Sequence, residues 1–422
     1  MNRYAGAAFA VTVLIASPIP RLCADAGPFD GKNFKGRIAY SADGNHNDED
    51  DWAASPVALA ILAEAGVKDR VVHFDYNSIL PLTDPEWEKI HATSVLGAAE
   101  RYGYARSIFH DSQRDRAGAV ESIRRAIDES TEDNPLYFIV AGPMEVAYLG
   151  IQKSKPDKKK FVYVISHSRW NDGFSPKYKF THSKRSVIPS GIRWVQIADQ
   201  NRLLSTSPYG RPAQEEEWSP WRWMRDSGNA RVQFLWERMR LTKRADCSDA
   251  GMAYFLVTGD EEGDPAKLRR LLEEHIVPQP VSARKSVRIE AENFLALENY
   301  EVEFRDDRQV SHRINVKLDR VGKGRIRTRF HEPFAGAGGQ YDVEVRYLDE
   351  KAGRSRFSLF INGILQGEPW EASSEDDAWK IHTIPGVRVR ASDEIIVEVQ
   401  GDSSEQGKLD YVQLNARSGT AF

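Results

Sequence analysis

Apolar and polar residues follow two different patterns along the chain, and the change falls close to residue 276. Between residues 37 and 275, short apolar runs alternate with longer stretches of helical periodicity. We expect strands at 37–40, 70–74, 136–140, 161–165 and 192–197. We expect helices at 55–64, 84–101, 116–128, 144–152, 229–240 and 265–275, with Ser55 capping the first and Pro56 in its first turn. This order predicts an α/β fold, with a mostly parallel sheet and helices on both faces.

The pattern that follows is that of an all-β domain. Short runs of alternating apolar and polar residues recur from Val287 onward, separated by clusters of Gly, Asp and Ser. They predict an antiparallel jelly-roll sandwich over residues 287–422. Pro278 and Pro280 stand in a polar stretch, so we interpret residues 277–286 as a linker and residues 27–276 as the first domain.

Residues 1–26 have the pattern of a signal peptide. Arg3 is followed by an apolar run at 5–16, then by prolines and by small residues around Ala24. The run is shorter than the roughly 20 residues that a membrane span needs, so we expect no membrane span and a secreted or periplasmic protein. Cleavage here would leave Cys247 as the single cysteine, and an intrachain disulfide is then impossible.

Composition narrows the class of partner. A net charge of −4 gives no electrostatic reason to expect nucleic acid as a partner. Ten tryptophans and fifteen tyrosines supply many flat rings, which suit stacking on sugars. We therefore expect a carbohydrate partner. The oligomeric state does not follow from these features.

Five acidic residues crowd the segment after the first predicted strand: Asp43, Asp48, Glu49, Asp50 and Asp51. In a parallel sheet, ligands bind outside the carboxyl ends of the strands, where this segment stands. Carboxylates held together without a counter-charge repel one another, and Ca²⁺ prefers oxygen ligands of this kind. We interpret the segment as a calcium site. The alternatives are a solvated acidic loop, or acids placed at a helix start because the helix dipole favours them there.

Two further segments give the first domain its resemblance to a known family. Residues 136–143 read as a strand that runs into Gly-Pro and a helix, and Asp249 stands at the head of another helix. Together with the Asp-rich turn and its Asp50–Asp51 pair, they resemble the nucleoside hydrolases over residues 37–275. The resemblance implies one Ca²⁺ held by Asp51, Asp249 and the backbone carbonyl of Ala141.

The resemblance also implies catalytic roles. Asp50 and Asn77 are expected to contact the sugar, and an aspartate of the first motif is expected to act as the general base. Asp43 is our candidate for that base. Asp48, a further candidate metal ligand, is its rival, because the spacing between Asp43 and the Asp50–Asp51 pair is longer than in the family.

Departures from the family argue against a nucleoside substrate. Ser248 stands where the family carries a histidine, and residues 166–173 replace its Asn–Glu–Asn cluster. His167 in that segment is a candidate proton donor, with a structural histidine as the alternative. Asn45, His46 and Asn171 are further candidates for contact with substrate, and the acids beside His46 are expected to raise its pKa.

Polar and aromatic residues elsewhere have two interpretations each. Trp218 and Trp221 either stack on sugar near the entrance of the site or pack the loop onto the body. The segment Asp199–Asn201 after a predicted strand either lines the site or forms a turn with Asx-type hydrogen bonds.

In the second domain, Glu290 and Glu292 share one face of a strand, and Asp410 could meet them from the last strand. The segments around them resemble the jelly-roll carbohydrate-binding modules that open with Glu-Ala-Glu and end with an Asp-Tyr-Val strand. This implies a structural Ca²⁺ on Glu290, Glu292 and Asp410. Tyr300, Trp370 and Trp379 are candidate sugar platforms, or core and edge residues.

These observations predict a secreted Ca²⁺-dependent glycoside hydrolase that cleaves a poly- or oligosaccharide through a metal-oriented water. Asp43, Asp50 and His167 are its predicted catalytic residues. One alternative is a carbohydrate-binding protein without turnover, because the first motif is altered and the family histidine is lost. Another is an exported hydrolase of N-ribosyl bonds.

Overall fold

A computed structural model of the chain describes residue 29 and residues 34–417, apart from 47, 81–83, 174–181, 277–285, 305–308, 312–313, 331–337, 391–392 and 403–404. The predicted signal peptide, residues 1–26, lies outside the described residues. So does the predicted linker, except for Ser286, which is the first residue of a strand. Among the helices of the described residues, none is both long enough and apolar enough to cross a membrane.

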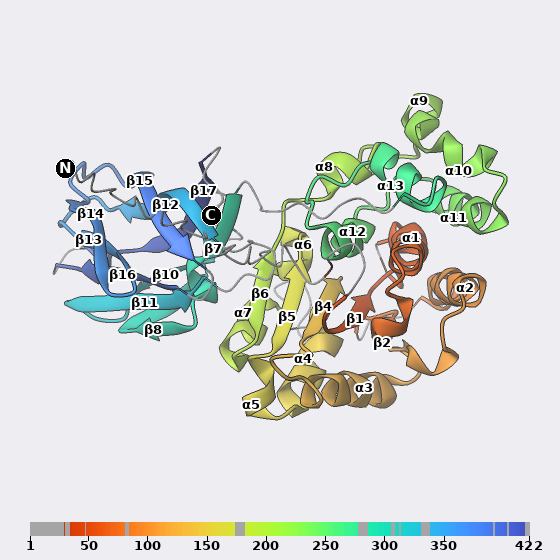
Figure 1. The fold of residues 1–422 in the computed structure, drawn as a ribbon, viewed down its shortest axis with the longest axis horizontal. Coiled ribbons are helices and arrows are strands. Elements are labelled where there is room, and N and C mark those ends of the chain that lie inside the picture. The colour runs from red at the N-terminus through yellow and green to blue at the C-terminus, as the bar shows by residue number, and fades with distance from the viewer. Residues whose placement is uncertain are drawn as a thin grey trace, which may run out of the picture.

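The first domain is built on a parallel sheet, as the sequence predicts, with six strands where five were expected (Figure 1). The strands are β1 (Arg37–Ala42), β2 (Val71–Tyr76), β3 (Phe109–Asp111), β4 (Leu136–Ala141), β5 (Val162–Ser166) and β6 (Arg193–Gln196). Their order is β3-β2-β1-β4-β5-β6, and every neighbouring pair is parallel. The chain builds outward from β1 in one direction and then, from β4, in the other. The carboxyl ends of β1 and β4 therefore flank the point where the order reverses, which is where open α/β sheets bind ligands.

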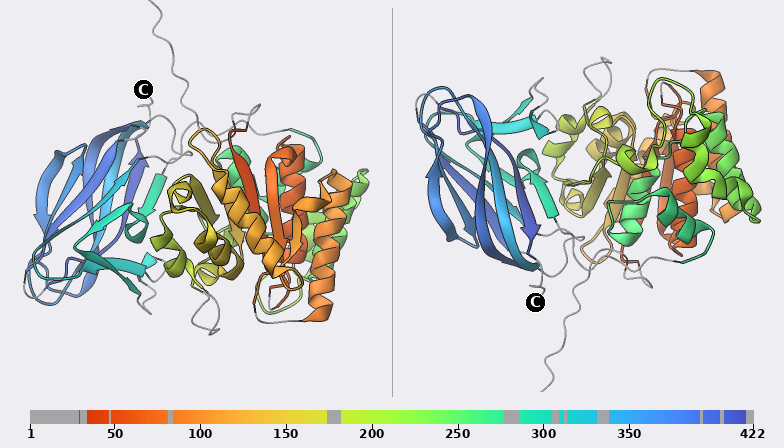
Figure 2. Two further views of the ribbon diagram at one scale, coloured as in Figure 1. Left: turned by 90° about the horizontal axis from the view of Figure 1, so that it is seen from below. Right: turned by 90° about the horizontal axis from the view of Figure 1, so that it is seen from above.

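Helices cover both faces of this sheet (Figures 1 and 2). One layer contains α1 (Asp51–Glu64), α2 (Pro85–Tyr102), α11 (Ala230–Leu241), α12 (Ala250–Thr258) and α13 (Pro265–Leu272). The other contains α3 (Arg116–Asp128), α4 (Glu145–Lys153), α5 (Pro156–Lys159) and α7 (Lys184–Val187). Short helices complete the domain: α6 (Arg169–Asp172), α8 (Asn201–Leu204), α9 (Glu215–Trp218) and α10 (Arg222–Asp226).

Alternating side chains of the strands feed two separate cores. Ile38 and Tyr40 of β1 pack with the α1 layer, whereas Ala39 packs with the α3 layer. In β4, Ile139 belongs to the first core and Phe138 to the second. A strand buried on both faces has no polar face, which explains why its sequence shows a continuous apolar run.

The start of α1 corrects a prediction. The helix begins at Asp51 and not after Ser55, so Pro56 lies inside it and Ser55 is not its cap. A proline at this position removes one backbone N–H from the helix, a cost that the buried first turn outweighs. Trp52, Ala53 and Ala54 are all buried. The consequence is that Asp51 belongs to a helix and has a fixed position.

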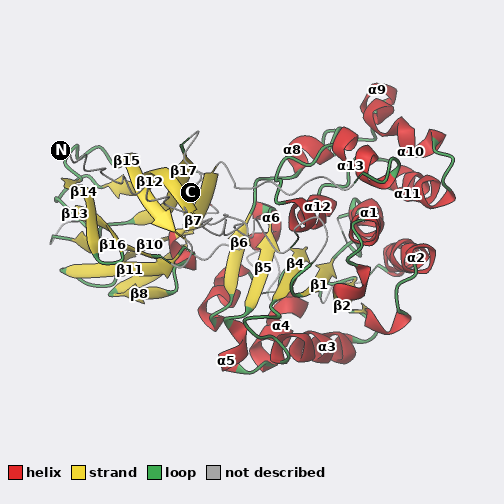
Figure 3. Cartoon of the chain, viewed as in Figure 1, coloured by secondary structure: helices red, strands yellow, loops and turns green. Residues whose placement is uncertain are grey.

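The second domain is a sandwich of two antiparallel sheets, as predicted (Figure 3). One sheet has the order β15-β12-β17-β10-β9, with β7 paired to β17, and the other has the order β14-β13-β16-β11-β8. The strands are β7 (Ser286–Glu290), β8 (Ala296–Glu298), β9 (Tyr300–Phe304), β10 (Ile314–Leu318), β11 (Lys323–Arg329), β12 (Gly338–Asp349), β13 (Arg356–Ile361), β14 (Ile364–Glu371), β15 (Ala378–Arg390), β16 (Glu394–Gln400) and β17 (Leu409–Ala416). The side of the sandwich that carries β7 and β17 lies toward β6 of the first domain (Figure 1).

Candidate metal centre and substrate pocket

The acidic segment begins where three strands of the parallel sheet end. Asp43 directly follows β1. Its backbone N–H donates to the carbonyl of Ala141 at the end of β4 (3.1 Å), and its carbonyl accepts from the N–H of Asn77 beyond β2 (3.1 Å). The carbonyl of Ala141, a predicted metal ligand, therefore lies beside the backbone of Asp43, the predicted base.

Two glycines leave room for the neighbouring side chains, Gly142 for Asp43 and Gly44 for His91 and Asp51. Gly142 has a φ of +147°, and a Cβ there would lie 2.8 Å from Asp43 Oδ1. Gly44 has a φ of +75°, and a Cβ there would lie 2.9 Å from Cβ of Asp51. Both backbone conformations are disfavoured for residues with a side chain, so these turns require glycine.

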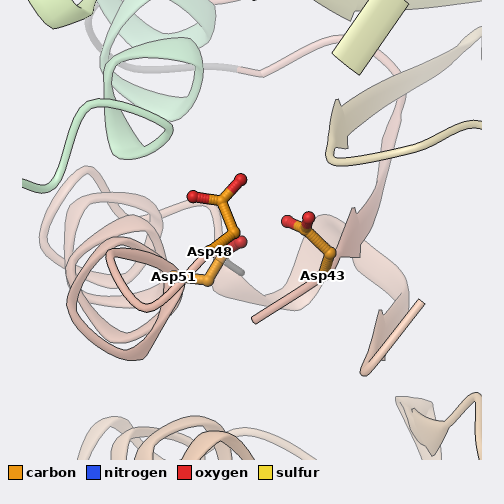
Figure 4. Close-up of side chains that lie close together, drawn as sticks. All are labelled: Asp43, Asp48 and Asp51. Carbon is orange, nitrogen blue, oxygen red and sulfur yellow. The ribbon is translucent and has the colours of Figure 1, made fainter. Parts of the chain in front are cut away.

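Three carboxylates converge in this turn. Asp43, Asp48 and Asp51 place one oxygen each within 4.8 Å of the others (Figure 4). Asp43 and Asp51 are fully buried, and both oxygens of each lack a hydrogen-bond partner. Oδ1 of the buried Asp50 also lacks one. Buried carboxylates without partners are costly, and a cation at their centre would remove this cost. The donor set fits Ca²⁺, whereas complete burial does not fit a solvated acidic loop.

The pKa values of these aspartates reflect the same cost of burial. Burial raises the pKa of Asp43 to about 8, and the neighbouring Asp249 and Asp50 add to the rise. Burial also raises the pKa of Asp48, Asp50 and Asp51 well above their usual range, and repulsion among the carboxylates contributes. The cluster without a counter-charge therefore favours bound protons.

Asp249, the predicted ligand from the last motif, is paired with His167. Its Oδ1 lies 2.5 Å from Nε2 of the ring. The backbone N–H of Gln200 donates to Nδ1 (3.2 Å), which places the ring proton on Nε2, between His167 and Asp249. Burial lowers the pKa of His167, but the carboxylates of Asp199 and Asp249 outweigh it and raise the pKa to about 10. If the ring took up a second proton, on Nδ1, the hydrogen bond from Gln200 would be lost. The new N–H would instead face Asp199, whose Oδ1 lies 3.6 Å from Nδ1.

A pocket of about 470 Å³ opens beside these residues. Five residues of the predicted site line this pocket: Asp48, Asp50, His167, Asn171 and Asp249. Asp43 and Asp51 are buried and are not among the residues that line it. Oδ1 of Asn171 is buried and lacks a hydrogen-bond partner. Its acceptor is therefore available at the wall of the pocket.

The pocket also contains residues that the sequence analysis did not identify. Tyr209 is 75% exposed, and its ring lies over the Arg244 guanidinium, 4.9 Å from ring centroid to Cζ. Arg244 in turn donates to Asp246 (2.8 Å) and lies 3.8 Å from Asp50. Trp170 is 41% exposed on the same pocket. Sequence offered no signal that separates these rings from buried ones.

The tryptophans predicted to stack on sugar are core residues. Trp218 and Trp221 are buried, with 3% and 0% of their surface exposed. Trp221 donates its indole N–H to Thr206 Oγ1 (2.9 Å), and Trp218 packs edge-on against Trp236. The packing interpretation is therefore the correct one, because a sugar cannot reach either ring.

Two residues that were predicted to contact the sugar form hydrogen bonds within the protein instead. Asn45 is fully buried, and its amide exchanges hydrogen bonds with the backbone of Ile79 (3.0 and 3.1 Å). Asn77, also fully buried, pairs with the ring of His91 (3.1 Å) and the carbonyl of Glu88 (3.3 Å). Neither side chain is accessible to a substrate. His46 is half-buried and belongs neither to the pocket lining nor to the carboxylate group.

The segment Asp199–Asn201 forms the turn that was one of its two interpretations. Oδ1 of Asp199 accepts from the backbone N–H and the side-chain amide of Asn201 (both 3.0 Å). Asn201 also lines the pocket, so the turn forms part of its rim.

The predicted calcium ligands of the sandwich have other partners. Lys184, a fully buried residue of α7, places Nζ 3.4 Å from Glu292 Oε1. Asp410 pairs with Arg346 and accepts from the N–H of Ser311 (3.0 Å). Among the described residues, the three carboxylates do not form a group whose ligand atoms all lie within 4.8 Å. Both oxygens of Glu292 nevertheless lack a hydrogen-bond partner, so the structural Ca²⁺ of the sandwich stays a prediction.

Two of the three candidate sugar platforms of the sandwich are buried. Tyr300 donates its hydroxyl to the carbonyl of Gly407 (2.8 Å) and is 7% exposed. Trp370 is 8% exposed and stacks on His382 and Phe357. These two rings belong to the core. Trp379 is half-buried, beneath the guanidinium of Arg346 (5.3 Å).

The chain matches no family model. It is 28% identical over 247 residues to "Uncharacterized protein P22" of Formosa agariphila, a match that covers 54% of this chain and 86% of that protein. It is 38% identical over 87 residues to "Probable alpha-glucuronidase A" of Aspergillus terreus, and this match covers 18% of this chain and 10% of the relative. The chain therefore spans about a tenth of the second relative.

Solved structures resemble about a third of the chain. A GH26-CBM35 β-(1,4)-mannanase of Podospora anserina is 19% identical, with a TM-score of 0.26, over 32% of this chain and 28% of that one. A family 35 carbohydrate binding module from Clostridium thermocellum is 18% identical, with a TM-score of 0.26, over 32% of this chain and all of that one.

Proposed function

We propose that this protein is a calcium-dependent hydrolase of glycosidic bonds, acting on a poly- or oligosaccharide outside the cytoplasm. The observation that carries the proposal is the group of buried carboxylates without hydrogen-bond partners at the switch point of the parallel sheet. An open pocket of about 470 Å³ adjoins them. Export rests on the pattern of residues 1–26 alone.

Ca²⁺ would be held by Asp43, Asp51 and the carbonyl of Ala141, and when bound it would acidify a water molecule and fix neighbouring sugar hydroxyls. In the proposal Asp43 is a ligand and not the base, because it is fully buried and does not line the pocket. Asp48 lines the pocket beside the cluster. It is therefore the better placed of the two rival bases.

The remaining roles follow from positions on the pocket wall. Asp48 accepts the proton of a water as its oxygen bonds to the anomeric carbon, and the bond from that carbon to the leaving oxygen breaks. The leaving oxygen needs a proton, and the proposed donor is His167 at the same pocket, whose Nε2 proton first leaves its hydrogen bond with Asp249. Asp50 and Asn171 accept hydrogen bonds from sugar hydroxyls.

Exposed rings favour a sugar over other ligands of this pocket. Trp170 and Tyr209 present flat faces at its mouth, and sugars stack on such faces through their C–H groups. The similarity of 87 residues to a probable α-glucuronidase agrees with a carbohydrate ligand, although it spans a tenth of that enzyme.

Release of reducing sugar by the purified protein tests the proposal. A panel of neutral and uronate-bearing polysaccharides would be incubated with Ca²⁺ and with EDTA, using wild type, Asp51→Asn and Asp69→Asn. Asp69 is an exposed aspartate of the same domain and serves as the matched control. We expect release that requires calcium, survives in Asp69→Asn and falls at least about 100-fold in Asp51→Asn.

Calorimetric titration with CaCl₂ separates the metal from the chemistry. Calcium binding that Asp51→Asn abolishes, without sugar release from any polymer, would favour a carbohydrate-binding protein over a hydrolase. Release of ribose from inosine would instead support the N-ribosyl hydrolase. Sugar release that persists in EDTA and in Asp51→Asn would overturn the proposal.

A further inference from the structure

A second cavity, of about 350 Å³, lies between the two domains. The first domain contributes His167, Asp199 and Glu261 to its lining, and the sandwich contributes Arg288 and Gln413. Its volume falls within the range of about 300–1,000 Å³ that is usual for small-molecule sites. Neither domain forms this cavity alone.

The domains are held together beside the cavity. Lys184 of the first domain and Glu292 of the sandwich are both fully buried and lie 3.4 Å apart. Nζ of Lys184 also donates to Gln196 Oε1 (3.2 Å), and Gln196 lines the cavity. A buried ion pair between two domains resists their separation, because each charge would be left without its partner. The ion pair therefore stabilises the arrangement of the two domains that forms the cavity.

His167 belongs to both hollows. It lines the pocket beside its partner Asp249 and also lines the interdomain cavity. The turn at Asp199–Asn201 separates the two, since Asn201 faces the pocket and Asp199 the cavity. A chain of linked sugars that crosses this turn would occupy both spaces at once.

Polar groups in the cavity are fixed before any ligand arrives. The Arg288 guanidinium stacks on Tyr411, with Cζ 3.8 Å from the ring centroid, and donates to Gln413 Oε1 through Nε (2.8 Å) and Nη2 (2.5 Å). Arg288 has five N–H donors, and these two bonds leave further donors on its exposed side. Glu261 accepts from the N–H of Ala198 (2.6 Å), which fixes its carboxylate at the lining.

The charges around the cavity indicate which sugar it accepts. Asp199, Glu261 and Glu290 bring three carboxylates to its lining, against two cationic groups, the guanidinium of Arg288 and the ring of His167. Carboxylates accept hydrogen bonds from hydroxyls but repel uronates and sulfates. The lining therefore suits a neutral unit rich in hydroxyls.

We propose that the cavity between the domains is a second subsite for a neutral sugar unit, continuous with the catalytic pocket across the Asp199–Asn201 turn. This inference rests on the proposed function and makes it narrower. The substrate is then a neutral glycan of several units, and the sandwich binds it as one wall of the site.

Binding of neutral tetrasaccharides tests the subsite without turnover. Laminaritetraose, mannotetraose and their disaccharides would be titrated by calorimetry in Ca²⁺, with Asp48→Asn added to wild type and to each variant so that the proposed base is absent. Arg288→Ala removes the fixed donors, and Gln413→Ala removes the acceptor that orients them. Arg356→Ala is the matched control, because it truncates an exposed arginine on β13 of the other sheet. Melting temperature and small-angle scattering would check that each variant keeps its domains docked.

We expect a tetrasaccharide to bind wild type and Arg356→Ala equally, and Arg288→Ala at least about 10-fold more weakly. Disaccharide binding at the catalytic pocket should not distinguish the variants. Equal tetrasaccharide affinity in Arg288→Ala, or no binding by any of these glycans, overturns the subsite.

Failure of the hydrolase is distinguishable from failure of the subsite. Glycan binding that depends on Arg288, without hydrolysis in Ca²⁺, would overturn the hydrolase proposal and support the subsite. The opposite outcome is calcium-dependent hydrolysis whose kcat/KM is the same on long and short substrates and is unchanged in Arg288→Ala. It would support the hydrolase and overturn the subsite.

Discussion

Asp51 combines complete burial with two carboxylate oxygens that no donor reaches. Without a cation, its charge is repelled by Asp43 and Asp48. Replacing the carboxylate with an amide removes one of the crowded charges, so we expect Asp51→Asn to melt about 2–4 °C higher than wild type in EDTA. In millimolar Ca²⁺ the order should invert, because wild type gains binding energy and the variant does not. Differential scanning calorimetry with and without calcium measures both.

Asp69→Asn provides the comparison for this experiment. Asp69 is exposed, so the same change of group should alter neither the melting temperature nor its response to calcium. An Asp51→Asn protein that melts lower than wild type in EDTA would mean that Asp51 is held by favourable contacts and not strained by repulsion.

Tyr209 and Trp221 show that ring type alone does not identify a sugar platform. Tyr209 is 75% exposed on the pocket, whereas Trp221 is fully buried. We expect Tyr209→Ala to keep its stability within about 0.5 kcal/mol and to raise KM several-fold, since it removes a stacking surface. Trp221→Ala should instead lower the free energy of unfolding by about 3–5 kcal/mol. Urea denaturation and steady-state kinetics on the same two variants separate the roles, and an unchanged KM in Tyr209→Ala would exclude it from the site.

At the scale of elements, the turn after β4 shapes the cluster more than any one helix does. Gly142 holds a φ of +147° with Asp43 Oδ1 2.8 Å from where a Cβ would stand. Gly191 also has a positive φ, but open space surrounds the position of its Cβ. Both Gly142→Ala and Gly191→Ala pay for backbone strain, about 1–3 kcal/mol. Only Gly142→Ala should also weaken calcium binding, by at least about 10-fold, because it displaces the Asp43 carboxylate. Calcium titration of the two variants decides this, and equal affinities would show that the turn tolerates a side chain.

The elements that the sequence predicted best are those with one clear period. Helix α3 was predicted with both ends correct, because its apolar stripe faces one core and Asp115 caps it. Helix α1 was predicted to begin four residues too late, because proline is common in the first turn of a helix and Pro56 was taken to mark it. The buried helix has no polar face, so no apolar stripe marked its true start. The acidic cluster could be found because its members are neighbours in sequence. Tyr209 and Arg244 could not, because exposure and long-range proximity leave no periodic signal.

At the scale of the whole molecule, the sequence predicted two domains but not how they meet. Resemblance assigned the carboxylates of Glu290, Glu292 and Asp410 to a metal. The structure also places Lys184 of the other domain beside Glu292, and Arg346 beside Asp410. No local pattern around Lys184 indicates such a partner, since Glu292 lies more than a hundred residues away. Which charge neutralises a buried carboxylate is a property of the assembled chain.

Lys184→Met tests whether this ion pair joins the domains. The variant leaves the Glu292 carboxylate buried beside an apolar side chain, which should lower the free energy of unfolding by about 3–5 kcal/mol. With the domains less firmly docked, the radius of gyration from small-angle scattering should rise. The double variant Lys184→Met/Glu292→Gln removes the unpaired charge as well, so it should recover more than half of the lost stability. A Lys184→Met protein with wild-type stability and wild-type scattering would show that other contacts hold the sandwich in place, and that the pair contributes little to the interface.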